Sequence, residues 1–202
     1  DVLFENIRAI ECGDDGISSH DDCQYHVDGF ASIGNSTGIC DTGESVTSYN
    51  HVFIRDCLGF DLYFLDINRH SVSNAVVLSS AARTLLVTGR EATNAVCTLT
   101  LDNILIRRVT GTNEVRVTKG AVLDARRVTL SGLNFQATGG EVRLRDSIIA
   151  GTPPPEVTIW SSSMERPGLL PSRARAKARV CARASWERRV ARVRRIGVAR
   201  VL

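Results

Sequence analysis

The sequence predicts an all-β protein folded as a parallel β-helix, a solenoid in which short strands stack turn upon turn. Short apolar runs of β character recur along the first 150 residues, and several of them end in Asn or Asp. Their spacing averages about 23 residues, which lies within the range of solenoid repeats. The positions that mark this spacing are Asn6, Asp28, Asp56, Asn74, Asn103, Arg126 and Asp146.

Each turn is expected to contain two or three strands separated by Gly, Asn, Asp or Ser bends. The first strand of successive turns is expected within residues 2–7, 26–30, 51–56, 73–78, 99–106, 121–125 and 141–146. The second is expected within residues 16–18, 38–40, 60–65, 85–88 and 114–118. Stacking turns gives these strands a continuous core. The residues predicted to face inward are Ile7, Ile17, Phe30, Ile39, Ile54, Leu65, Val77, Leu101 and Val128.

The main alternative fold is a β-sandwich, which also joins short strands by turns. A helical domain is not expected, because no amphipathic stretch with the helical period occurs before residue 165. His26, His51 and His70 each stand close to the start of a run, which suggests equivalent corners of successive turns.

Composition divides the chain into a body at residues 1–150, a Pro/Ser linker at 151–164 and an Arg/Ala-rich tail at 165–202. The chain carries a net charge of +3, but the tail alone holds eleven Arg, one Lys and two Glu, so residues 1–164 are acidic. An acidic body argues against nucleic-acid binding by the folded part. The tail is expected to be disordered or non-native; a basic arm and a lipid-binding helix are the alternatives.

The chain opens within a run and without a polar cap, so we expect an interior fragment of a longer, monomeric solenoid. A signal peptide would then lie out of view, and an extracellular or cell-envelope location is expected. No apolar run is long enough for a transmembrane segment. The six cysteines follow no zinc-site spacing and are expected to be buried thiols, although a Cys12–Cys23 or Cys23–Cys40 bridge is open in an exported protein.

The most specific local feature lies between Glu11 and Cys23, where five acidic residues and a histidine occupy thirteen positions. Such carboxylates repel one another unless a cation, a cationic partner or a raised pKa offsets the cost. The candidate catalytic residues are His20, Asp14, Asp15 and Asp21, and the candidate ligands of a Ca²⁺ ion are Asp14, Asp15 and Asp22. A solvated turn or a structural Ca²⁺ clip is the simpler interpretation.

Two resemblances bear on this segment. Gly13-Asp-Asp-Gly-Ile-Ser18 resembles the Gly-Asp-Asp-Cys-Ile-Ala segment of polygalacturonase-type glycoside hydrolases, which are right-handed parallel β-helices. That resemblance implies that Asp14 and Asp15 belong to a catalytic carboxylate set. Residues 16–57 are similar to the alginate C5-epimerase β-helix, which implies His20 as the base and Asp21 as its neighbouring acid.

These observations predict a carbohydrate-active protein that acts on or binds an acidic polysaccharide, as a uronate lyase, a C5-epimerase or a pectinase-like hydrolase. Proton abstraction at C5 needs a base such as His20 and a positive group for the substrate carboxylate. Substrate contacts are predicted at Asp28, Arg55, Tyr63 and Arg69. The alternative is a non-catalytic adhesin stalk or polysaccharide-binding repeat protein.

Overall fold

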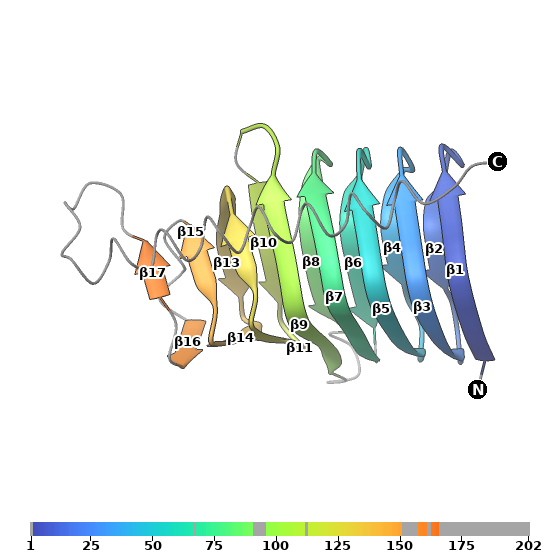
Figure 1. Ribbon diagram of the computed structural model, residues 1–202. Coiled ribbons are helices and arrows are strands. Elements are labelled where there is room, and N and C mark those ends of the chain that lie inside the picture. The colour runs from blue at the N-terminus through green and yellow to red at the C-terminus, as the bar shows by residue number, and fades with distance from the viewer. Residues whose placement is uncertain are drawn as a thin grey trace. The chain divides into compact units, whose positions relative to one another are not determined.

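The computed structural model describes residues 2–66, 68–90, 96–111 and 113–150, and the backbone of 157–160 and 163–165. The described part is all-β, and its strands pair in parallel to form a right-handed solenoid of about six turns (Figure 1). The predicted parallel β-helix is therefore confirmed, and the β-sandwich alternative is wrong.

Two sheets run along the solenoid. Sheet A follows the order β1-β3-β5-β7-β9-β11-β14-β16, with β12, β15 and β17 paired beside it, and sheet B follows β13-β10-β8-β6-β4-β2. The sheet A strands are β1 (Val2–Ile10), β3 (Gln24–Ile33), β5 (Val46–Arg55), β7 (Arg69–Ser79), β9 (Cys97–Arg108), β11 (Ala121–Arg126), β12 (Thr129–Ser131), β14 (Glu141–Arg145), β15 (Ile148–Ala150), β16 (Val157–Trp160) and β17 (Ser163–Glu165). The sheet B strands are β2 (Asp15–Ser19), β4 (Thr37–Asp41), β6 (Phe60–Asp66), β8 (Arg83–Gly89), β10 (Asn113–Thr118) and β13 (Leu133–Thr138).

A column of residues with positive φ bends each long strand of sheet A. Asn6, His51, Asn74 and Asn103 have φ between 51° and 57°, a conformation that Asn adopts more readily than most residues. Amide side chains bond along this corner: Asn74 Nδ2 donates to Asn50 Oδ1 at 2.7 Å, and Asn103 Nδ2 donates to Asn74 Oδ1 at 2.6 Å. The repeating Asn therefore has two roles: it adopts the positive φ that the bend requires, and its side chain forms hydrogen bonds with the turns above and below.

Some of the residues used to measure the repeat spacing do not lie at this corner. Asp56 lies at the next corner, where its φ of 57° matches the 51° of Glu11. The three histidines do not share a corner: His51 stands at the bend, His26 lies on the outer surface of β3, and His70 is buried. The prediction of equivalent histidine corners is wrong, because only the Asn-type bend repeats at this position.

The core follows the predicted inward pattern with one exception. Ile39, Leu62, Leu85 and Val115 stack in register and are at most 1% exposed. Leu65 was expected inward but lies in a half-buried outward position, because its neighbours Leu62 and Phe64 supply the buried side chains of β6. Burial of each fully buried apolar side chain, such as that of Leu62, stabilises the fold by about 1.5–3 kcal/mol.

The interior also contains polar groups. Asp41, at the end of β4, is fully buried and accepts hydrogen bonds from Tyr25, Tyr49 and Thr47. Asp61, in β6, is also fully buried, but neither of its carboxylate oxygens has a hydrogen-bond partner.

The first 165 residues form one compact unit, and the predicted linker contributes β16 and β17, which pair with β14 and β15. The predicted tail beyond Glu165 lies outside the described residues. Of the described cysteines, Cys40, Cys57 and Cys97 are buried as predicted, and Cys12 is exposed; all are free thiols.

Candidate functional site

The acidic segment of the first turn is divided between two corners. Asp14 and Asp15 stand at the start of β2, whereas His20, Asp21 and Asp22 follow its end. A strand of this length separates the two groups by about 17 Å. The structure therefore does not bring Asp14, Asp15 and Asp22 together, and no cluster of three His, Cys, Asp or Glu suited to a metal ion occurs among the described residues.

His20 is held by hydroxyl groups. Its Nε2 lies 2.9 Å from Ser18 Oγ, and its Nδ1 lies 2.8 Å from Thr42 Oγ1. Thr42 Oγ1 donates its one hydrogen to the carbonyl oxygen of Ser19 at 3.2 Å. Thr42 Oγ1 therefore accepts the hydrogen bond from His20 Nδ1. Nε2 then accepts from Ser18. The hydrogen-bond partners of the His20 ring are thus the hydroxyl groups of Ser18 and Thr42, and Asp21 stands at the corner with a φ of 60°.

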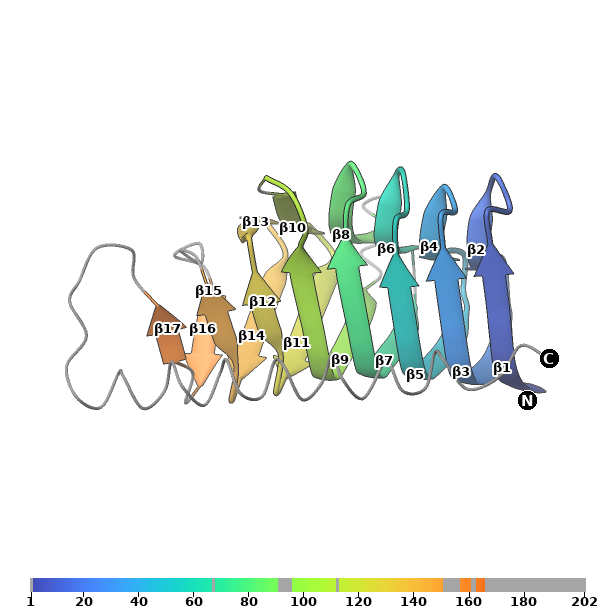
Figure 2. The ribbon, with the colours of Figure 1, turned by 45° about the horizontal axis from the view of Figure 1, so that its top comes forward.

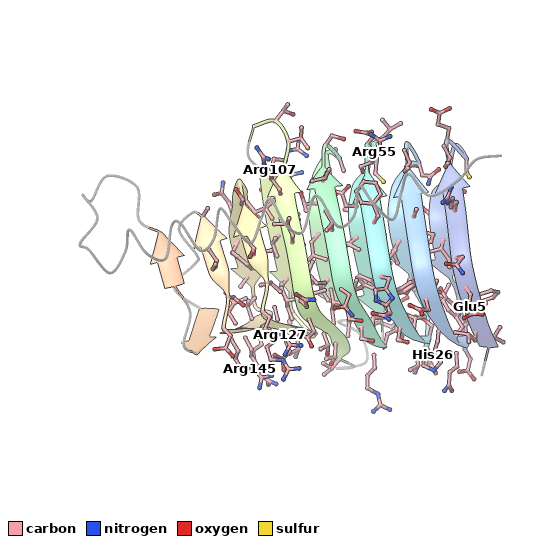
Figure 3. The ribbon with its side chains drawn as sticks, in the orientation of Figure 1. Glu5, His26, Arg55, Arg107, Arg127 and Arg145 are labelled. Carbon is pink, nitrogen blue, oxygen red and sulfur yellow. The ribbon has the colours of Figure 1, made fainter. Side chains whose placement is uncertain are left out.

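The predicted substrate contacts lie on separate parts of the surface. Asp28 stands beside the sheet A bend, where its Oδ1 is 2.7 Å from His51 Nδ1. Arg55 ends β5 at the opposite edge and lies 3.5 Å from Asp56 (Figure 3). Arg69 begins β7 and is exposed. Of these four residues, Tyr63 alone lies on the outer face of sheet B.

That outer face holds an aromatic pair that the sequence reasoning recognised only in part. Phe60 and Tyr63 stack with ring centroids 4.7 Å apart and an interplanar angle of 12°. The guanidinium carbon of Arg83 lies 5.4 Å from the centroid of Phe60, within cation–π range. Both rings are half-buried, so this pair forms a fixed but accessible surface.

The local fold explains why the pair forms. Asp61 and Leu62 are both buried, which interrupts the in-out alternation of β6 and brings Phe60 and Tyr63 to the same face. The parallel register then sets Arg83 of β8 beside Phe60. The repeat could have predicted this neighbour of Phe60. Arg83 follows Phe60 by 23 residues, the same spacing that joins Asp28 to His51.

Beside the aromatic pair, sheet B carries a shallow depression of about 370 Å³. Its lining is mostly polar and consists of Ala82, Arg83, Asn113, Glu114, Arg116 and Asn134. Arg116 Nη2 donates to Glu114 Oε2 at 3.0 Å and to Gln136 Oε1 at 3.3 Å. Gln136 Nε2 completes the ring of contacts by donating to Glu114 Oε1 at 2.7 Å. The guanidinium is thus oriented by neighbours on two strands.

We call the surface formed by Phe60, Tyr63, Arg83, Arg116 and Glu114 the sheet B platform. It extends over β6, β8 and β10, which lie side by side in Figure 2. Cys40 adjoins Tyr63 in register, and burial raises the pKa of its thiol to about 12. The thiol is therefore uncharged at neutral pH. The platform offers a stacking surface and the guanidinium group of Arg83, beside an Arg116–Glu114 ion pair. Of these groups, Arg83 is the one placed to bind an anionic ligand next to the rings.

Comparison with known protein families, with curated proteins and with solved structures finds no match for this chain. Over the residues that the structure describes, no helix has the length and apolar character needed to cross a membrane.

Proposed function

We propose that this protein binds an acidic polysaccharide along the sheet B platform. The observation that carries the proposal is the stacked Phe60–Tyr63 pair with Arg83 beside it. Aromatic rings pack against the apolar faces of sugar rings, and guanidinium groups form paired hydrogen bonds with carboxylates. A uronic acid polymer presents both features in every residue.

The repeat of the solenoid matches a polymeric ligand better than a small one. Successive strands of sheet B are about 4.8 Å apart, close to the length of one sugar residue. Tyr63, Arg83 and Arg116 stand on three successive strands. An extended chain lying across these strands would therefore meet a ring-stacking position, then the guanidinium group of Arg83, and then the Arg116–Glu114 ion pair.

The test is calorimetric titration of the whole protein with polygalacturonate and with alginate. We expect Tyr63→Ala and Arg83→Ala each to weaken binding by about fivefold, since a stacking or cation contact contributes about 1 kcal/mol. Arg143→Ala is the matched control, because Arg143 is an exposed arginine on sheet A that pairs with Glu141. Equal affinity of Tyr63→Ala, Arg83→Ala and the wild type would refute the platform.

A second candidate is catalysis by a uronate lyase or C5-epimerase on the same bound chain. The observation that favours it is the placement of His20 at the exposed end of β2, with Nε2 held against Ser18. An imidazole that two hydroxyl groups hold in place has the geometry of a general base. Ultraviolet absorbance of unsaturated uronates tests this activity, and His20→Ala should abolish it while leaving binding at Tyr63 unchanged.

A further inference from the structure

A serine, a histidine and a threonine are joined by hydrogen bonds on the outer face of sheet B. Ser18 Oγ lies 2.9 Å from Nε2 of His20, and Nδ1 of the same ring lies 2.8 Å from Thr42 Oγ1. Because the Thr42 hydroxyl donates to the carbonyl oxygen of Ser19, the ring carries its proton on Nδ1 and accepts from Ser18 at Nε2. The hydrogen bonds therefore run in one direction, from Ser18 through His20 to Thr42.

The alternation of β2 and its register with β4 bring these groups together. Ser19 is 2% exposed and points inward, so its neighbours in sequence, Ser18 and His20, point outward. The parallel register sets Ser19 opposite Asp41, the last residue of β4, and Thr42 follows at the level of His20. Every group in this arrangement thus comes from β2 or from the turn that follows it.

This order of groups is that of an activated nucleophile. A serine hydroxyl becomes a nucleophile when an adjacent base takes its proton, and a third group on the other side of the base holds the base in place. Ser18 has the position of the nucleophile, His20 that of the base, and Thr42 that of the positioning group. The proton nearest to Nε2 belongs to the Ser18 hydroxyl, so the geometry prepares proton transfer from this oxygen.

The arrangement continues the face that carries the sheet B platform. Ser18, Cys40 and Tyr63 stand in register on β2, β4 and β6. Ser18 therefore lies two strands, about 10 Å, from the stacking position at Tyr63. A sugar chain that stacks on Tyr63 and extends over β4 would reach Ser18 about two sugar residues farther along.

We propose that Ser18 is the nucleophile of an esterase site that removes ester groups from the polysaccharide bound at the platform. For its substrate this inference rests on the proposed function. The charges near the site favour an ester over a free carboxylate, because Asp15 begins β2 and Asp21 and Asp22 follow its end. An ionised carboxylate at Ser18 would be repelled by them, whereas an acetyl or methyl ester group is uncharged.

The reaction has two halves, and water is its co-reactant. Ser18 Oγ forms a bond to the ester carbonyl carbon while its proton passes to His20 Nε2. The bond from this carbon to the alcohol oxygen then breaks, and His20 gives the proton to the leaving alcohol. In the second half, water loses a proton to His20 and attacks the acyl group on Ser18. The acid is released, and the proton returns to Ser18 Oγ.

The first test uses the full chain without polysaccharide. Diisopropyl fluorophosphate should label Ser18, as located by mass spectrometry, and the protein should hydrolyse p-nitrophenyl acetate. Ser18→Ala should lower this hydrolysis to the background rate, and His20→Ala should lower it by about 100-fold or more. Ser48→Ala is the matched control, because Ser48 Oγ also contacts a histidine ring, at Nδ1 of His26 on sheet A. Label on another residue, or full hydrolysis by a Ser18→Ala variant with wild-type circular dichroism, would overturn the proposal.

The role of Thr42 is tested by two variants. Thr42→Val removes the acceptor of the hydrogen bond from His20 Nδ1, so we expect kcat to fall by about tenfold with little change in KM. Thr42→Ser keeps the hydroxyl group and should retain the wild-type kcat. A loss of equal size in both variants would mean that Thr42 acts through packing and does not position the ring.

The substrate is tested with acetylated and with methyl-esterified polygalacturonate, by measuring the release of acetate and of methanol. Release of either product by the wild type and not by Ser18→Ala identifies the ester. Release of neither would overturn the polysaccharide ester as the substrate. Unsaturated uronates formed by Ser18→Ala at the wild-type rate would assign His20 to proton abstraction from carbon and would overturn the esterase.

Calorimetric titration separates this proposal from the proposed function. Ser18→Ala should bind polygalacturonate as tightly as the wild type, because Tyr63 and Arg83 are unchanged. Binding without ester hydrolysis would reject the esterase alone. Hydrolysis of p-nitrophenyl acetate through Ser18 without polysaccharide binding would reject the platform and, with it, the polysaccharide as the substrate of this site.

Discussion

Two carboxylates inside the solenoid differ sharply in their surroundings. Asp41 is buried among donors: Thr47 Oγ1 lies 2.6 Å from its Oδ2, and the hydroxyls of Tyr25 and Tyr49 lie within 3.1 Å. Asp61 is equally buried, yet neither oxygen accepts a hydrogen bond. One interior carboxylate is therefore part of a satisfied network, whereas the other carries a desolvation cost that its surroundings relieve only in part.

The pKa values follow from this difference. Burial raises the pKa of Asp41, while hydrogen bonds from Thr47, Ser19 and the two tyrosines lower it. Burial raises the pKa of Asp61 to about 7, and Ser79 and Arg108 lie close enough to offset only part of that effect. The pKa is thus raised at both sites, but four hydroxyl groups oppose the effect of burial at Asp41, whereas one hydroxyl and one guanidinium group oppose it at Asp61.

His70 extends the Asp41 network. Thr47 donates its proton to Asp41 and therefore accepts from His70 Nδ1, 2.7 Å away. The Nε2 atom of His70 is buried without a hydrogen-bond partner. Burial lowers the pKa of His70 to about 4, so the ring is neutral at physiological pH. Tyr25, Tyr49, Thr47 and His70 together tie β3, β5 and β7 to the end of β4.

The largest expected effect comes from removing the satisfied carboxylate. Asp41→Ala should reduce the free energy of unfolding by about 4 kcal/mol, because it removes the acceptor shared by the hydroxyls of Tyr25, Tyr49 and Thr47 and leaves a cavity beside them. Urea denaturation followed by circular dichroism measures the change. A loss below about 1 kcal/mol would mean that the network does not anchor these strands.

The comparison predicts that Asp61→Asn, unlike Asp41→Ala, raises the free energy of unfolding at alkaline pH. With its folded-state pKa raised to about 7, Asp61 keeps in the folded protein a proton that the unfolded chain has released. Stability due to this group is therefore present at low pH and is lost as the pH rises from about 4 through about 7. Relative to the wild type, Asp61→Asn should gain about 2 kcal/mol between about pH 5 and about pH 8.

Asp41→Asn is the matched control for that experiment. The same chemical change at a satisfied carboxylate should destabilise the protein at about pH 8, since Asn replaces an acceptor of three hydrogen bonds by an amide with two donors. A gain in both variants at high pH would remove the distinction between the two sites. Thermal unfolding at both pH values, with each variant compared with the wild type, isolates the contribution of the single group.

The smallest of these effects concerns one hydroxyl of the network. Tyr49→Phe removes a hydrogen bond to Asp41 but leaves Tyr25 and Thr47 in place, so we expect a loss of about 1 kcal/mol. Tyr63→Phe, on the outer face of sheet B, should change the free energy of unfolding by less than about 0.5 kcal/mol. Equal losses in the two variants would contradict a special role for the buried hydroxyl.

The period of the sequence predicted the fold because every turn repeats the same physical requirement. Asn6, Asn74 and Asn103 were identified from the sequence, since a residue that tolerates positive φ must recur at the bend. Leu65 was misassigned because Asp61 and Leu62 are both buried, and this break in alternation has no signature in hydrophobicity. The partners of Asp41 were also hidden, since Tyr25, Tyr49 and His70 come from three different turns.

The candidate site shows the same limit. The carboxylates between Glu11 and Cys23 look like one group in the sequence, but β2 separates them. An extended strand between two corners places residues that are close in sequence far apart in space. The sheet B platform depends on residues one and two periods apart. Arg83 would have been found by writing the sequence in rows of one 23-residue turn, which places it below Phe60. Arg116 would not, because it follows its register partner Leu86 by 30 residues.

The Asn corner also bears on how this architecture accommodates change. Asn50 follows Asp28 by 22 residues, whereas Asn103 follows Asn74 by 29, yet both pairs are joined by side-chain hydrogen bonds at the same bend. The longer turn places its extra residues between β8 and β9 and leaves the strand register intact. The register of β7 with β9 is thus kept across turns of different length, so we expect the chain between Gly89 and Cys97 to accept a grafted foreign peptide.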